Sequence, residues 1–257
     1  MLAYTYELEK EFESIDNLLK SKYGVNIKEK EQYVEFVRDS LGLLMSLKIW
    51  NKHLEEIFDN IKGIDNYFKE MISNTIHMII LGTLDLKVPA LVMLRRTQES
   101  ILSFLYFYEH PVEYYKKEND DNIKILSGFS ELKDYVKGYP FSIKYNLGDQ
   151  DVRSIVQKII DDWGILYKDL SNYVHGTNSK YFQQVSYFDE FKFEKKEINY
   201  LKKQVQKLSG IINALLICFF FERYVRFDEN MEKSLVRNCI NNETGYKAKI
   251  VGVFKEI

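Results

Sequence analysis

Apolar residues recur every three or four positions along most of this chain, which is the spacing of amphipathic helices. Only 3 prolines and 12 glycines interrupt its 257 residues, and long stretches without either residue favour long helices. The pattern predicts helices over residues 6–23, 28–61, 64–84, 89–108, 123–136, 151–176, 193–227 and 231–241. We therefore expect an all-α fold, a single helical bundle over residues 1–257 with long antiparallel helices.

Two segments depart from the helical pattern. Residues 178–193 contain Val185, Tyr187, Phe191 and Phe193 at the alternate spacing that is typical of extended chain. The C-terminal sequence YKAKIVGVFKEI also has strand character. Pairing of these two segments would give a small C-terminal hairpin. The lysine-rich residues 114–122 and the residues 138–148 are predicted to be connections without helix.

Charge and composition argue against several classes of protein. The formal net charge is −2 and the pI is about 6.2, so the overall field does not attract duplex nucleic acid or anionic membranes, although a local basic groove is compatible with it. The most apolar stretch, 211–221, is too short to cross a bilayer and is predicted to be a buried helix. Two cysteines do not form a disulfide scaffold, and the acidic N-terminus is no secretory signal, which favours a cytoplasmic protein without membrane contact.

The residues with the most suggestive chemistry lie at the end of the 151–176 helix, in the sequence LSNYVHG. Ser171 and Lys168 precede His175 by one and two helical turns, so the three share a face, and Asn172 lies beside them. Gly176 suits the position after a helix end, where the helix dipole favours a protonated ring. A histidine there could give or take a proton. The alternative is that it only caps carbonyls or covers the core.

A second candidate cluster lies in the 89–108 helix, where Arg95 and Arg96 are followed by Glu99. The spacing of three and four residues puts guanidinium and carboxylate on one face. Either the residues form an ion pair at a solvated edge, or one arginine supplies a phosphate-binding cation to a neighbouring helix.

The other three histidines are weaker candidates. His77 lies in an apolar helix and is predicted to be a core residue, His53 lies among charged residues on a predicted exposed face, and His110 precedes a proline at a helix end. No pair of them has the spacing of a metal site. We expect no metal and no cofactor.

The helix that ends in YKDLSNYVHG resembles the motif helix of the HEPN superfamily, all-α bundles found in bacterial toxins, antiphage abortive-infection proteins and CRISPR-linked nucleases. That motif is an arginine, usually a polar residue, four to six further residues and then a histidine. His175 matches the histidine. Lys168, followed by Asp169, stands where the arginine would be, so this chain departs from the family at that position.

The resemblance implies a metal-independent endoribonuclease of bacterial antiphage defence or toxin type. His175 would transfer protons, Lys168 with Arg95 or Arg96 would stabilise the phosphate, Glu99 would position an arginine, and Ser171 and Asn172 would orient the site. RNA would be the substrate, and the protein would be a homodimer or the partner of another defence protein. The alternative is a catalytically inactive HEPN-like module that binds a protein or nucleic-acid partner in a defence complex.

Overall fold

The computed structural model describes residues 3–120, 128–145, 149–176, 178–181 and 194–254, and within them every regular element is a helix. This confirms the predicted all-α bundle. The α-helices are α1 Ala3–Tyr23, α2 Glu31–His53, α3 Glu55–Asn60, α4 Asn66–Thr83, α5 Lys87–Glu109, α6 Pro111–Asn119, α7 Phe129–Gly138, α8 Phe141–Tyr145, α9 Asp149–Val174, α10 Lys195–Phe219, α11 Phe221–Tyr224, α12 Ser234–Cys239 and α13 Tyr246–Phe254. Short 3₁₀ turns η1 Ile27–Glu29, η2 Ser179–Tyr181 and η5 Asn242–Thr244, and the π-helical turn η4 Glu229–Lys233, connect them.

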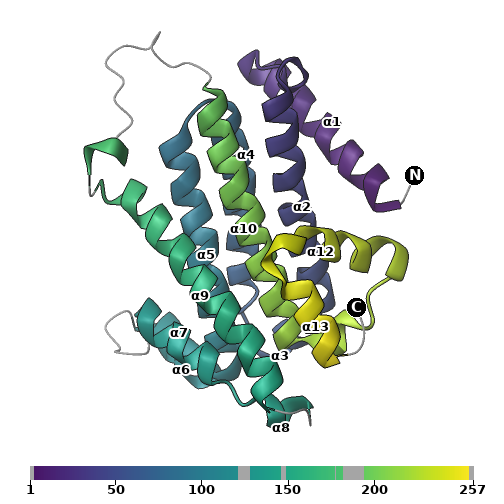
Figure 1. Ribbon diagram of the computed structural model, residues 1–257, viewed down its shortest axis with the longest axis vertical. Helices are drawn as coiled ribbons and strands as arrows, with labels where there is room; N and C mark the ends of the chain where they lie inside the picture. Colours follow the sequence, from purple (N-terminus) through teal and green to yellow (C-terminus); the bar gives the residue numbers. More distant parts are fainter. Residues whose placement is uncertain (1–2, 121–127, 146–148, 177, 182–193, 255–257) are drawn as a thin grey trace.

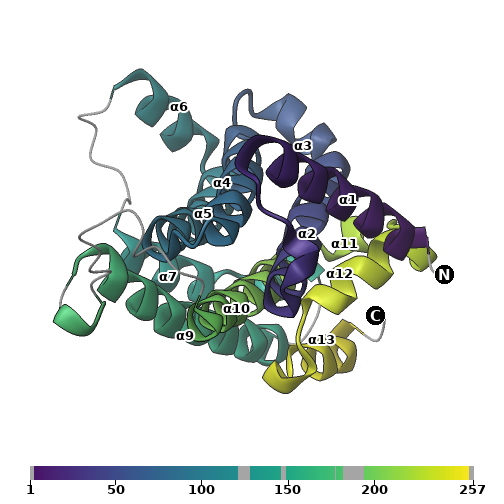
Figure 2. The ribbon, with the colours of Figure 1, turned by 90° about the horizontal axis from the view of Figure 1, so that it is seen from above.

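Helix α10 runs through the middle of the molecule and contacts α2, α5, α9, α12 and α13 (Figures 1 and 2). Every residue from 208 to 220 is buried, as the apolar sequence 211–221 predicts. No helix in the described part of the chain has the length and apolarity that a membrane span requires. The central position of α10 explains why its second half is apolar on all sides, whereas its first half has exposed lysines on one face.

Helices α4 and α5 form an antiparallel pair joined by residues 84–86. Gly82 allows this pair to approach the centre, because a Cβ atom there would lie 2.6 Å from the ring of Phe36 and 2.8 Å from Leu201. The turn itself contains Asp85 at φ 60°, and its carboxylate accepts a hydrogen bond from Tyr33 of α2 at 2.6 Å. The pair is therefore fixed against both α2 and α10.

A polar network crosses the core between α2 and α10. Asn213 is fully buried, and its Oδ1 accepts a hydrogen bond from Trp50 Nε1 at 3.0 Å. Its Nδ2 donates to Ser46 Oγ at 3.0 Å and to the carbonyl of Ser209 at 2.9 Å. Because buried polar groups are costly without partners, this network specifies how the two helices pack.

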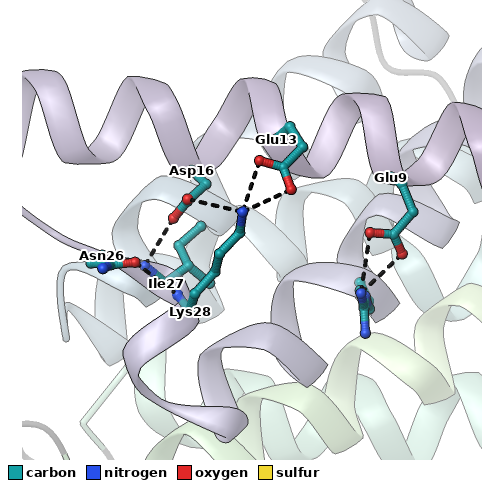
Figure 3. A network of polar contacts seen from close by, with 7 residues as sticks. Glu9, Glu13, Asp16, Asn26, Ile27 and Lys28 are labelled. Carbon is teal, nitrogen blue, oxygen red and sulfur yellow. Dashed lines mark hydrogen bonds and ion pairs between the residues drawn. The ribbon is translucent and has the colours of Figure 1, made fainter.

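Polar contacts hold α1 against the start of the second helix, as Figure 3 shows. Asp16 is almost fully buried and accepts a hydrogen bond from the backbone N–H of Ile27 at 3.1 Å. Lys28 forms an ion pair with Glu13 at 2.8 Å. The carboxylate of Asp16 thus ties α1 to the first N–H of η1, next to the N-cap residue Asn26, and fixes where α2 begins.

Several predicted boundaries were wrong. The predicted helix 28–61 is divided at Leu54, whose φ of −102° and ψ of 2° end α2 before α3 begins. The predicted connection 114–122 lies largely in α6, where Tyr114 is 2% exposed and packs against the ring of Phe107. The predicted connection 138–148 contains α8, which buries Phe141. In both connections buried aromatic side chains outweigh the polar composition.

The predicted C-terminal hairpin was wrong in its second half, because residues 246–254 form α13. Tyr246, Ile250 and Phe254 are four residues apart and are all buried, so a helix puts them on one face toward the bundle. The Tyr246 hydroxyl also donates to Asp162 of α9 at 2.6 Å. The other half of the predicted hairpin falls largely in residues 182–193, which lie outside the described part.

We predict that Asn213→Ala lowers the free energy of unfolding by about 1–3 kcal/mol, because it leaves the buried indole N–H of Trp50 without an acceptor. Urea denaturation measures the loss. The control is Asn60→Ala, which removes an exposed hydrogen bond and should change the free energy by less than about 0.5 kcal/mol. Equal free energies of unfolding for the two variants would contradict the role given to Asn213 in the packing of α2 against α10.

Candidate functional site

Two reciprocal hydrogen bonds join α5 to α9. Gln98 Nε2 donates to the backbone carbonyl of Trp163 at 2.8 Å, and Trp163 Nε1 donates to the backbone carbonyl of Gln98 at 3.0 Å. Both residues are fully buried. Each helical carbonyl uses its second lone pair, so the bonds form without disturbing either helix. They fix the register of α5 along α9, because sliding either helix by one residue would break both bonds.

This register brings Arg95 against Tyr167. Arg95 lies three residues before Gln98, and Tyr167 lies four residues after Trp163, so the two meet one turn away in the antiparallel pair. The ring of Tyr167 stacks on Trp163 with centroids 4.9 Å apart and an interplanar angle of 11°. The guanidinium carbon of Arg95 lies 4.7 Å from the centroid of Tyr167. The buried indole therefore sets the position of the ring that receives the arginine.

The guanidinium of Arg95 connects three side chains. Its Nε donates to Glu99 Oε1 at 2.9 Å, one Nη donates to the Tyr167 hydroxyl at 2.7 Å, and the other Nη lies 2.9 Å from His175 Nε2. The Arg95 side chain is 13% exposed, while His175 is exposed. A largely buried cation thus holds an imidazole at the surface (a cluster we call the Arg95–His175 site).

The contact between Arg95 and His175 determines the form of the imidazole. A guanidinium is only a hydrogen-bond donor, so Nε2 must accept, and the ring carries its proton on Nδ1. The end of α9 is as predicted, since the N–H of His175 donates to the carbonyl of Ser171 at 2.9 Å and Gly176 has φ 55°.

The structure brings Arg95, Glu99 and His175 together from two helices, but it places Arg96 elsewhere. Arg96 forms an ion pair with Glu70 of α4 at 2.7 Å, and its side chain is 55% exposed. Neighbouring residues on a helix point about 100° apart, so only one of the two arginines can face α9. Of the two adjacent arginines, Arg95 is therefore the one that contacts His175.

The remaining sequence candidates lie around the site without contacting the imidazole through a hydrogen bond. Lys168 is exposed and forms no ion pair with any residue that the structure describes. Ser171 Oγ donates to the carbonyl of Tyr167 at 2.7 Å, within α9. Asn172 Nδ2 donates to the hydroxyl of Tyr181 at 3.3 Å. Ser171 and Asn172 therefore support the end of the helix rather than the ring of His175.

Sequence reasoning missed Tyr167, which it assigned only to the apolar stripe of its helix. A tyrosine in such a stripe carries a hydroxyl that needs a partner when it is partly buried. Tyr167 also lies eight residues before His175, on an adjoining part of the helix surface. Those two facts together were a usable signal that the face receives a polar group from another helix.

A second cluster fixes the last turn of α9 against α5 and α10. The ammonium of Lys87 lies 4.9 Å from the ring centroid of Tyr173 and 5.3 Å from that of Tyr200. Lys87 also forms an ion pair with Glu197 at 3.0 Å. Because Tyr173 lies two residues before His175, these contacts restrict the position of the imidazole.

The other histidines have different roles from His175. His77 is exposed, so its assignment to the core was wrong. His53 is 20% exposed, and its Nε2 lies 2.7 Å from Glu232. Burial alone would raise the pKa of Glu232, but the N–H of Asp228 and the side chains of His53 and Lys52 hold that pKa below its usual range. His110 Nδ1 contacts the carbonyl of Tyr106 at 2.9 Å, at the end of α5.

Comparisons of the chain with models of protein families, with curated proteins and with solved structures find no match.

We predict that the His175 ring is the Nδ1–H tautomer, with Nε2 accepting from Arg95. Long-range proton–nitrogen spectra of the ring, recorded where imidazoles are neutral, distinguish the two nitrogens. In Arg95→Met the donor is absent, so the ring should shift toward the Nε2–H form that free histidine prefers. Identical ring spectra in the two proteins would show that the contact does not form in solution.

Proposed function

We propose that this protein is a metal-independent endoribonuclease of the HEPN type, acting in bacterial antiphage defence or as a toxin. The observation that carries the proposal is the 2.9 Å contact between Arg95 and His175. It supplies, from a neighbouring helix, the arginine that the motif helix lacks. The resemblance of YKDLSNYVHG to the HEPN motif helix supports the same chemistry.

The arrangement suits transfer of a phosphoryl group within RNA. A phosphate that binds Arg95 would accept the Nη donors that now contact His175 and Tyr167, which frees Nε2. Nε2 would then take the proton of the ribose 2′-hydroxyl as its oxygen bonds to phosphorus. The bond from phosphorus to the 5′-oxygen breaks, and that oxygen takes a proton from the imidazolium or water, leaving a 2′,3′-cyclic phosphate.

Glu99 and Tyr167 have positioning roles in this proposal. The ion pair of Glu99 with Arg95 Nε leaves one Nη group for the imidazole of His175 and the other for the hydroxyl of Tyr167. Arginine suits this position better than lysine, because the guanidinium donates to its three partners from three separate nitrogens of one rigid plane, whereas lysine has a single nitrogen. The second subunit of the proposed homodimer would supply a second copy of the Arg95–His175 site.

A specific observation favours the second candidate function, a catalytically inactive module that binds a partner. Lys168 occupies the position of the motif arginine, is exposed and has no acidic partner among the described residues. An exposed cation without an acidic partner suits binding to a polyanion rather than a defined role in chemistry. A cleavage assay distinguishes the ribonuclease from the inactive binding module.

We predict that the purified protein cleaves single-stranded RNA in the presence of EDTA and leaves cyclic phosphate ends. His175→Ala and Arg95→Lys should each reduce the rate by at least about 100-fold, since general base and phosphate contacts typically contribute that much. Arg96→Lys is the matched control, because it makes the same change one residue away, at a side chain that pairs with Glu70. His77→Ala controls for loss of an exposed histidine.

Equal cleavage by all of these variants would exclude the Arg95–His175 site. Absence of cleavage by the unaltered protein, together with RNA binding that persists in His175→Ala and weakens in Lys168→Gln, would instead establish the inactive binding module.

A further inference from the structure

A cavity of about 510 Å³ lies on the other side of α10 from α5, and none of its lining residues belongs to the Arg95–His175 site. Residues of α2, α10, α12 and α13 line it, among them Asp39, Gln206, Ser209, Cys239 and Lys247. Figure 2 shows α12 and α13 on one side of α10 and α5 on the other. Its volume lies in the range of sites for small molecules.

Asp39 supplies an anion without a cationic partner. Its carboxylate accepts one hydrogen bond, from Gln206 Nε2 at 2.8 Å, and forms no ion pair with a described residue. Lys202 is within electrostatic reach, but it is paired with Glu35 at 2.6 Å. Burial raises the pKa of Asp39 above its usual value. A carboxylate in this position is stabilised by a ligand that brings a positive charge.

Lys247 supplies a cation that likewise lacks a partner within the described residues. Burial lowers the pKa of Lys247, and Arg237 lowers it further. The neighbouring thiol of Cys239 does not neutralise the ammonium, because burial raises the pKa of that thiol to about 11. The cavity therefore has one unpaired charge of each sign in its lining.

A buried hydroxyl is also available. Ser209 is 3% exposed, and apart from its contact with the Cys239 thiol its Oγ has no hydrogen-bond partner. A buried polar atom without a partner costs free energy, which a ligand could recover by supplying the missing hydrogen bond.

We propose that this cavity binds a small zwitterion of the amino-acid class, with its ammonium on Asp39 and its carboxylate on Lys247. A simple cation would leave Lys247 without a counter-charge, and a simple anion would leave Asp39 without one. A zwitterion satisfies both, because it carries one charge of each sign. Gln206 and Ser209 then offer hydrogen bonds to the remainder of the ligand. The assignment is independent of the proposed ribonuclease activity.

The experiment screens the common L-amino acids one at a time against the full chain, by thermal shift and then by calorimetry. At least one should raise the melting temperature and bind at a single site. Asp39→Asn and Lys247→Gln should each weaken that binding at least about tenfold, the loss expected for one charge-assisted contact. Lys249→Gln alters an exposed lysine of the same helix and should bind as the unaltered protein does. His175→Ala should also bind normally.

The proposal is overturned if no amino acid binds to the folded protein, or if binding persists undiminished in both Asp39→Asn and Lys247→Gln. It is also overturned if inorganic phosphate alone or a diamine alone binds as tightly as any amino acid, because one charge would then suffice. The melting temperature of each variant without ligand shows that it is folded.

Discussion

The Arg95–His175 site depends on the two hydrogen bonds exchanged between Gln98 and Trp163. Both bonds are buried, and both use backbone carbonyls as acceptors. They fix the position of α5 along the length of α9. A side chain can slide or rotate at low cost, but a helix register held in this way cannot shift without leaving two buried donors unpaired. The position of the guanidinium relative to the imidazole follows from that constraint.

Given this register, the chemistry of the site centres on one guanidinium. Arg95 contacts a carboxylate, a phenol and an imidazole at once, through three nitrogens held in one plane. In that contact Nε2 of His175 is the acceptor, and its lone pair is the one that a base would use in the proposed function. The same contact occupies Nε2. An anion that accepts the Nη hydrogen bonds of Arg95 in place of His175 would leave Nε2 available as a base beside the bound anion. In the proposed ribonuclease, substrate binding and activation of the base would then be one event.

The sequence predicted the helical bundle, because the spacing of apolar residues depends only on which side of each helix is buried. It also identified His175, Arg95 and Glu99 as candidates. It could not choose between Arg95 and Arg96, because that choice depends on the rotation of α5 against α9. The strand predicted at the C-terminus failed for a related reason: Tyr246 and its neighbours have strand propensity, but the bundle offers them a surface that only a helix can cover.

The most direct test of this account is a double-mutant cycle on RNA cleavage with Arg95→Met, His175→Ala and the combined variant. If the two side chains act as one unit, the combined variant should be no slower than the slower of the single variants. Losses that multiply in the combined variant would show that the residues act independently. A rate that neither substitution changes would contradict the assignment of the site altogether.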